Sequence, residues 1–281
     1  MESLLNQTRQ MLRRYDLRAR KGLGQHFLID EGVLEQIISA AQLAPDDVVI
    51  EVGPGLGVLT RELAKHAGRV IAIELDDKLA AILKESLSAA RNVTIVNEDV
   101  LKVDQSALLN GLNAASYKVV ANLPYYITSP VLRHFLEAPE KPELMVVMVQ
   151  KEVAEEIAAK PGKMSLLSIG VQLYGAPEIV AKVPSSSFYP APAVDSAILK
   201  ITPYSRPPVE ISDVAGFFKL ARAGFSAARK QLANSLARGL GIPKEEAADL
   251  LAKANIASQR RAQTLSIEEW ANLWRVYGEM K

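Results

Sequence analysis

The chain has 281 residues, of which 49% are apolar and 23% charged, with a formal net charge of +1; this balance is typical of globular proteins and excludes a fibrous or largely disordered one. It contains no cysteine, which excludes disulfides, thiolate metal sites and cysteine nucleophiles, and its three histidines are scattered, so we expect no metal. No apolar run reaches the roughly 18 residues that span a bilayer, and no secretory signal opens the sequence, so we expect a cytoplasmic protein with no membrane contact.

Short apolar, β-branched runs alternate with helical stretches through the middle of the chain. This alternation predicts an α/β fold with a mostly parallel sheet flanked by helices. The expected strands, the last two of which could pair antiparallel, are Val48–Val52, Val70–Glu74, Val93–Asn97, Lys118–Ala121, Leu144–Val149, Glu178–Val183 and Ser196–Ile201. The expected helices between them are Leu59–Ala67, Lys78–Ala90 and Pro130–Glu137.

The C-terminal quarter of the chain has a different pattern. A Pro-rich segment, Pro203–Pro208, indicates a linker, and helical periodicity without a convincing strand runs from Asp213 to the end. Gly239 and the segment Gly241–Pro243 predict a break between helices there. We therefore expect three parts: a flexible basic N-terminal arm at residues 1–19, an α/β domain at 20–205 and a small all-helical domain at 206–281.

Positive charge gathers at the two ends of the sequence. Residues 1–29 hold six Lys/Arg against two Asp/Glu and residues 206–281 hold twelve against eight, whereas residues 30–205 hold fifteen against twenty-two. Basic ends are expected if they bind phosphates; an ordinary fluctuation of composition is the alternative. The pair Arg260–Arg261 is a weaker signal of phosphate binding. Four residues would form a basic stripe on one face of a continuous helix, unless Gly224 breaks it: Lys219, Arg222, Arg229 and Lys230.

A glycine-rich loop, EVGPGLG at residues 51–57, follows the first expected strand. Its glycines let the backbone approach a ligand closely, at the strand end where such sheets bind nucleotides. Glu74 ends the next strand, twenty-one residues after Gly53, and can accept both ribose hydroxyls; Asp99 follows the third strand and can accept a hydrogen bond from an adenine amine. Tight turns and solvated carboxylates are the alternatives. Nicotinamide binding is the weaker interpretation, because the third glycine comes one residue too early.

The fourth expected strand is followed by Asn122-Leu123-Pro124-Tyr125. An adenine amine is a poor nucleophile because its lone pair is delocalised into the ring, and acceptors for both amine protons localise that lone pair toward a methyl donor. The side-chain oxygen of Asn122 and the carbonyl of Leu123 can be those acceptors, and Tyr125 offers a face on which an extruded base can stack. An ordinary Asn-Pro turn is the alternative.

These motifs resemble those of the ribosomal RNA adenine dimethyltransferases, and the resemblance extends to KGLGQHFL at residues 21–28 and FYPAPAVDS at residues 188–196. It implies a Rossmann-like class I methyltransferase that uses S-adenosylmethionine and no metal. It also implies that Phe188 completes a sandwich around the target base with Tyr125; a core aromatic is the alternative. The cofactor contacts that it implies are His26, Leu28, Gly53, Glu74, Asp99 and Asn122.

Two branches of this superfamily differ in substrate. One modifies two adjacent adenosines near the 3′ end of small-subunit (16S) ribosomal RNA, and the other modifies one adenine of large-subunit RNA and confers antibiotic resistance. The helical tail and FSAARKQLANSL at residues 225–236 resemble the small-subunit branch, although Ala227 and Ala228 stand where that branch commonly has glutamine and arginine. This resemblance implies dimethylation of both adenosines within an immature small ribosomal subunit, by an enzyme that we expect to be monomeric. A large-subunit methyltransferase, a DNA adenine methyltransferase and a non-catalytic assembly factor are the alternatives.

Overall fold

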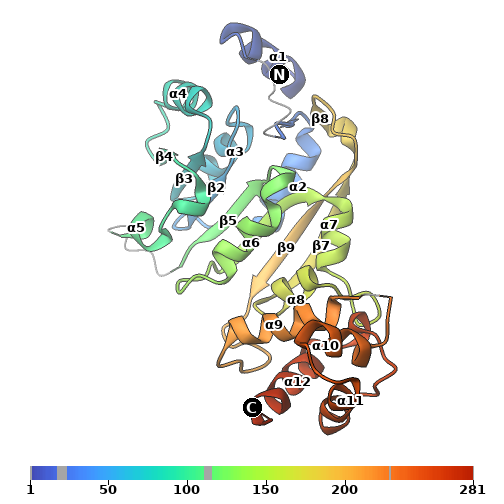
Figure 1. The fold of residues 1–281 in the computed structure, drawn as a ribbon. Coiled ribbons are helices and arrows are strands. Elements are labelled where there is room, and N and C mark those ends of the chain that lie inside the picture. The colour runs from blue at the N-terminus through green and yellow to red at the C-terminus, as the bar shows by residue number, and fades with distance from the viewer. Residues whose placement is uncertain (1, 18–23, 111–115, 228, 281) are drawn as a thin grey trace. The chain divides into compact units, whose positions relative to one another are not determined.

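The computed structural model describes residues 2–17, 24–110, 116–227 and 229–280. Within these ranges the chain forms two compact units, most of whose helices and strands are labelled in Figure 1. The sheet unit comprises Met1–Ala154 and Pro177–Pro203, and the helical unit comprises Glu155–Ala176 and Tyr204–Lys281. None of the helices in the described part of the chain is long and apolar enough to cross a membrane.

Seven strands form the main sheet, in the order β4-β3-β2-β5-β6-β9-β7 (Figure 1). They are β2 (Val48–Val52), β3 (Arg69–Glu74), β4 (Val93–Asn97), β5 (Lys118–Asn122), β6 (Leu144–Gln150), β7 (Gly175–Val183) and β9 (Ser196–Pro203). The pairs along β4-β3-β2-β5-β6 are parallel, and β9 is antiparallel to β6. All seven predicted strands are confirmed, and so is the mostly parallel α/β fold. Every residue of β2 is buried, as expected for a parallel strand in the middle of a sheet.

Helices flank this sheet: α2 (Glu31–Ala41) contacts β5, β6 and β9, and α4 (Asp77–Ser86) contacts β3 and β4. An aspartate begins each of them, because Asp30 accepts a hydrogen bond from the N–H of Val33 and Asp76 accepts one from the N–H of Lys78. The sequence predicts α4 but not α2. The remaining helices between β2 and β6 are α3 (Val58–His66), α5 (Gln105–Leu109) and α6 (Thr128–Leu136), of which α5 is not predicted.

The N-terminal segment, predicted as a flexible arm, contains the helix α1 (Leu4–Arg14). Met11 and Leu12 of this helix, with Leu17, pack against a cluster of three buried residues, Phe27, Leu56 and Leu79. Leu56 belongs to the glycine loop. Phe27 also belongs to a second, two-stranded sheet, in which β1 (Phe27–Leu28) pairs with β8 (Phe188–Tyr189). The described part of the arm is therefore anchored beside the glycine loop.

The helical unit contains more of the chain than the sequence boundaries gave it. Residues 155–176, which those boundaries place in the larger domain, are joined by backbone hydrogen bonds to residues after β9: the N–H of Gly162 donates to the carbonyl of Gln263 (2.8 Å), and the N–H of Tyr204 donates to that of Tyr174 (2.8 Å). The helices are α8 (Leu166–Gln172), α9 (Val214–Phe225), α10 (Leu232–Leu240), α11 (Lys244–Lys253) and α12 (Ile267–Glu279), with α7 (Lys151–Ile157) at the boundary between the units. The predicted break at Gly241–Pro243 is confirmed, between α10 and α11.

The predicted basic stripe is wrong, because no continuous helix carries its four residues. Lys219 and Arg222 lie on α9, which ends at Phe225, whereas Arg229 and Lys230 lie between α9 and α10. A pair of serines holds the intervening turn: Ser226 Oγ donates to the carbonyl of Ser235 (3.0 Å), and Ser235 Oγ to that of Ala227 (3.1 Å). All four basic residues are exposed. Ala228 lies outside the described residues.

Close packing of α9 on α10 depends on Gly239. A Cβ at this position would lie 2.4 Å from the Cα of Ala223, which is backbone and has little freedom to move. We therefore expect Gly239→Ala to lower the free energy of unfolding by about 1–3 kcal/mol, the usual cost of overpacking. Gly170→Ala is the matched control, since a Cβ there meets nothing within 4 Å and alanine is the better helix former by about 0.5–1 kcal/mol. Denaturant unfolding curves should move in opposite directions for the two variants; equal shifts would contradict this account.

Candidate active site

A pocket opens at the carboxyl ends of β2, β3 and β5, the edge at which sheets of this kind bind ligands. The structure brings eight of the nine predicted site residues into its lining. They are His26, Leu28, Gly53, Glu74, Asp99, Asn122, Leu123 and Tyr125. The ninth, Phe188, does not line it.

The glycine loop forms one wall of the pocket. Gly53 has φ +67° and Gly55 has φ +59°, left-handed conformations that a side chain would strain. A Cβ on Gly55 would lie 3.3 Å from the ring of Phe27. The backbone can therefore lie close to a ligand at these two positions, as the sequence predicts.

Glu74 is fixed by the same loop. Its Oε2 accepts a hydrogen bond from the N–H of Gly55 (3.1 Å) and its Oε1 one from the N–H of Asp76 (2.9 Å). Burial raises the pKa of Glu74, and these backbone donors oppose that rise. A carboxyl group with two backbone bonds and a buried setting is a rigid acceptor for a polar ligand.

Asp99 lines the pocket together with two exposed apolar side chains. It caps a single 3₁₀ turn, η2 (Val100–Lys102), by accepting a hydrogen bond from the N–H of Leu101 (3.0 Å). Leu75 is 51% exposed and Leu101 38% exposed, and both line the pocket. Sequence reasoning missed these two residues, although each follows a strand-end acid within two positions. A carboxylate beside apolar side chains fits a flat heterocycle with an amine.

Glu51 is the pocket residue with an unsatisfied buried atom. It is 1% exposed, and its Oε2 has no hydrogen-bond partner among the described residues. Burial, with a smaller contribution from the negative charge of Glu74, raises the pKa of Glu51 from 4.5 to about 8. A buried polar atom in the wall of a pocket is a candidate partner for a polar ligand group.

Asn122 ends β5 with its amide oriented by the protein. Its Nδ2 donates a hydrogen bond to the backbone carbonyl of His26 (3.2 Å), so its Oδ1 is left as an acceptor in the pocket. The N–H of Leu123 donates to the carbonyl of Met148 (3.1 Å), and the Leu123 side chain is buried. Leu123, whose carbonyl is the second predicted acceptor, is therefore fixed by its own N–H and by its buried side chain.

Tyr125 lies in the turn after Pro124, with contacts at two points of its ring. The ring stacks against that of His26, with centroids 5.9 Å apart and planes 25° apart. Its hydroxyl shares a hydrogen bond with Ser196 Oγ (2.8 Å). The next residue, Tyr126, also lines the pocket and is 53% exposed; sequence reasoning missed it because an exposed tyrosine carries no signal of its own.

Phe188 lies elsewhere than the sequence-based sandwich requires. It is 3% exposed and pairs with Leu28 across the β1–β8 sheet. Its ring belongs to the main apolar cluster, with residues such as Ile37 and Met148. The structure thus places Phe188 in the core, and a contact with a base stays a prediction that would require this ring to move.

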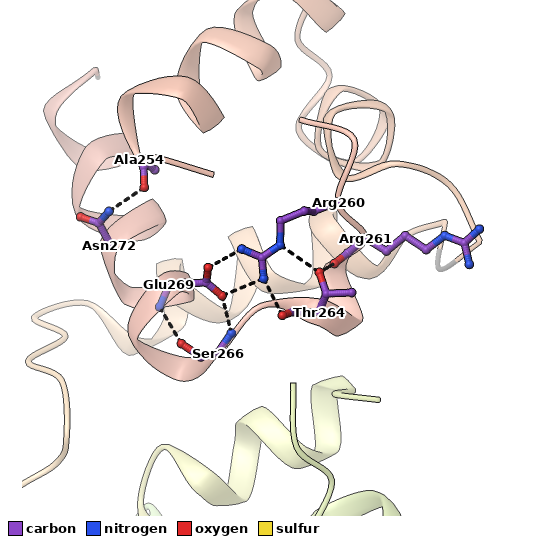
Figure 2. A network of polar contacts seen from close by, with 7 residues as sticks. All are labelled: Ala254, Arg260, Arg261, Thr264, Ser266, Glu269 and Asn272. Atoms are coloured by element: carbon purple, nitrogen blue, oxygen red, sulfur yellow. Dashed lines mark hydrogen bonds and ion pairs between the residues drawn. The ribbon is translucent and has the colours of Figure 1, made fainter. Parts of the chain in front are cut away.

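In the helical unit, the two neighbouring arginines at 260 and 261 differ in their surroundings (Figure 2). Arg260 forms a two-pronged ion pair with Glu269 and donates to the carbonyl of Thr264 (2.6 Å). Ser266 and Glu269 bond to each other's backbone N–H and begin α12. Figure 2 shows the side chain of Arg261 pointing away from this network, and it is exposed. Arg260 is therefore a structural residue, whereas Arg261 can meet a phosphate.

The chain is similar along almost its entire length to proteins of one family. The sequence profile of the family described as ribosomal RNA adenine dimethylase matches residues 16–273. The chain is 56% identical over 99% of its length to a protein of Dehalococcoides mccartyi named ribosomal RNA small subunit methyltransferase A, 94% of which is covered. A protein of that name from Alkaliphilus metalliredigens is 44% identical, with 95% of each chain covered.

Two solved structures are also similar to the chain. A dimethyladenosine transferase from Plasmodium falciparum is 26% identical, with a TM-score of 0.76, 90% of this chain and 98% of that chain covered. The 23S ribosomal RNA methyltransferase ErmE is 30% identical, with a TM-score of 0.69, 89% of this chain and 98% of that chain covered. From this match along almost its entire length, the chain belongs to the ribosomal RNA adenine dimethylase family.

Proposed function

We propose that the chain transfers methyl groups from S-adenosylmethionine to the exocyclic amines of two adjacent adenosines near the 3′ end of small-subunit (16S) ribosomal RNA. The observation that carries this proposal is the orientation of Asn122, whose amide is bonded to the carbonyl of His26 so that its Oδ1 is free to accept in the pocket. Relatives that are 44–56% identical and are named small-subunit methyltransferases favour this substrate over large-subunit RNA.

The pocket fits S-adenosylmethionine, which would supply an activated methyl group there. The glycine loop can approach the cofactor closely, Glu74 can accept its ribose hydroxyls, and Asp99 with Leu75 and Leu101 can hold its adenine. The unsatisfied Oε2 of Glu51 offers a further partner for a polar group of the cofactor. His26 and Leu28, which line the same pocket, complete the proposed cofactor contacts together with Gly53 and Asn122.

The residues around the target amine act by positioning. Asn122 Oδ1 and the carbonyl of Leu123 accept one amine proton each, which directs the nitrogen lone pair toward the methyl donor. Pro124 has no N–H that could compete for these acceptors. Tyr125 stacks on the extruded base. No strong general base is required, because the methylated ammonium is acidic enough to lose its proton readily.

Exposed basic residues of both units would bind the RNA backbone. In the helical unit these are Lys219, Arg222, Arg229, Lys230 and Arg261, and on α1 they are Arg9 and Arg13. Together they give a salt-dependent affinity that is largely independent of sequence. We propose that the substrate is an immature small ribosomal subunit in the cytoplasm and that the enzyme acts as a monomer.

Glu74 offers a test of the cofactor site. We expect Glu74→Ala to raise the Kd for S-adenosylmethionine about 10- to 100-fold, since the change removes hydrogen bonds from a charged acceptor. Isothermal titration calorimetry would measure this. Glu62, which pairs with Lys65 on α3, does not line the pocket, so Glu62→Ala is the matched control and should bind as the wild type does. Equal affinities of the two variants would contradict the cofactor assignment.

The substrate is tested with labelled S-adenosylmethionine and unmodified small and large ribosomal subunits, offered separately. We expect dimethyladenosine from the small subunit only, located at adjacent positions near the 3′ end. Label in the large subunit would assign the chain to the resistance branch instead. Cofactor binding without transfer to either subunit would favour a DNA substrate or a non-catalytic assembly role. An assay of methyl transfer to duplex DNA would then distinguish these two alternatives.

A further inference from the structure

The ring of Tyr125 is held more firmly than its role as a stacking surface alone requires. One face of the ring lies against His26, and its hydroxyl is bonded to Ser196 Oγ at 2.8 Å. Burial raises the pKa of Tyr125, so the hydroxyl keeps its proton and can share this bond. A tyrosine with a contact on one face and a fixed hydroxyl has little freedom to turn about its side-chain torsions.

Ser196 is built into a rigid part of the fold. It is fully buried, and as the first residue of β9 it pairs with Gln150 of β6. The preceding residue, Asp195, is fixed twice: its carbonyl accepts from the N–H of Lys151 (3.0 Å) and its Oδ1 accepts from the N–H of Ser185 (2.9 Å). The Oγ of Ser196 therefore has a fixed position, and its hydrogen bond can hold the hydroxyl end of the Tyr125 side chain in place.

His26, which backs the ring, is fixed as well. Its Nδ1 donates to the carbonyl of Pro190 at 2.7 Å, and its own carbonyl accepts the amide of Asn122 at 3.2 Å. One residue thus supports both the proposed amine acceptor and the proposed base-stacking ring. The two supports of Tyr125, His26 and Ser196, come from segments 170 residues apart in sequence that the sheet unit brings together.

We propose that Ser196 is a positioning residue that, with His26 behind the ring, holds Tyr125 with its free face toward the target base. This inference rests on the proposed function. Ser196 does not line the pocket among the described residues, so it acts through Tyr125. Because small displacements of a positioning group lower the rate of reaction steeply, loss of this single hydrogen bond should lower turnover while leaving the cofactor site intact.

The test is a double-mutant cycle of Ser196→Ala and Tyr125→Phe, each of which removes one partner of the same hydrogen bond. We expect each single variant to lower kcat on small subunits about tenfold, as one hydrogen bond is worth in rate, and the double variant to be no slower than either. The Kd for S-adenosylmethionine should stay within about twofold of the wild type. Ser196→Thr, which keeps the hydroxyl, should recover most of the rate.

A second measurement does not depend on turnover. Small-subunit RNA with 2-aminopurine at the target adenine loses fluorescence when that base stacks, and we expect less quenching by Ser196→Ala than by the wild type at equal RNA occupancy. Ser187→Ala is the matched control, a buried serine whose hydroxyl bonds to Asp30 instead (2.8 Å), and it should leave both kcat and quenching unchanged.

Additive losses in the cycle, or Ser196→Ala with wild-type kcat and quenching, would overturn this inference while the proposed function stood. A wild-type enzyme that methylates no adenine in small-subunit RNA would overturn the proposed function and this inference with it. Melting temperatures and cofactor binding distinguish a positioning effect from unfolding. A misfolded Ser196→Ala would melt at a lower temperature than the wild type and would also lose cofactor binding.

Discussion

Asn122→Ala is expected to lower the rate of methyl transfer by about 10²–10³, the usual cost of removing one preorganised polar group from the reacting centre. The substitution removes Oδ1, the proposed acceptor for one proton of the adenine amine, and leaves the amine lone pair delocalised. Small-subunit RNA should still bind, because its affinity depends on exposed cations in α1 and the helical unit. Single-turnover kinetics with labelled cofactor would measure the loss.

The same change also removes the hydrogen bond from Nδ2 to the carbonyl of His26, so a control must show what the loss of an amide-to-carbonyl bond outside the site does to activity. Asn272 provides it: its Nδ2 donates to the carbonyl of Ala254 (2.8 Å) in the helical unit (Figure 2). Asn272→Ala loses a bond of the same kind and should keep full activity. Transfer by Asn122→Ala at more than a tenth of the wild-type rate would contradict the assignment of Asn122 as the amine acceptor.

Much of the fold follows from the sequence because the parallel strands are continuous apolar, β-branched runs, whether fully buried as in β2 or half-buried as in the edge strand β4. Val48–Val52 and Val93–Asn97 are predicted with the bounds that the structure has, because continuous runs of β-branched residues favour strands over helices and turns. The helix at Glu31–Ala41 is missed. It carries a glycine in its first turn and is stabilised by packing against β5, β6 and β9, which local sequence does not reveal.

The site is predictable to the extent that it follows strand ends. Gly53, Glu74, Asp99 and Asn122 each stand at or just beyond the carboxyl end of one of four adjacent parallel strands, whose carboxyl ends share one edge of the sheet and so bring these residues together. Phe188 belongs to no such series, and only the pairing of β1 with β8 decides which way its ring faces. Long-range contacts of this kind have no sequence signal in a single chain.

The basic stripe fails for a related reason. Its four residues share a face only if helical periodicity continues past Phe225, and two serines close a turn there through hydrogen bonds eight and nine residues apart. Arg260 is likewise absorbed into a network with Glu269 that is nine residues away. Charge in a sequence indicates affinity for phosphate, but hydrogen bonding decides which charges are free to bind it.

Glu51 determines a pH dependence of stability that is opposite to that of an ordinary carboxylate. Its pKa is about 8 in the folded chain and 4.5 is its ordinary value, so between these pH values the folded chain holds a proton that the unfolded chain releases. The contribution of Glu51 to stability therefore falls as the pH rises from about 4.5 to about 8, and it does not change further above pH 8. Burial dominates, and the groups that face Glu51 act in opposite directions, since the Thr60 hydroxyl and Arg61 lower its pKa whereas Glu74 raises it.

Glu51→Gln should remove this dependence, because the amide fills the same space, stays neutral and has no proton to lose. We expect the variant to be more stable than the wild type at pH 9, by on the order of a few kcal/mol, and the difference to shrink toward zero as the pH approaches 4.5. Denaturant unfolding at several pH values measures it, with Glu85→Gln, an exposed carboxyl next to Arg14, as the control. A difference that does not change with pH would mean that Glu51 is ionised in the folded chain, held so by Arg61. The wall of the pocket would then carry a negative charge before any cofactor arrives, and a cationic cofactor would be attracted by a charge already present.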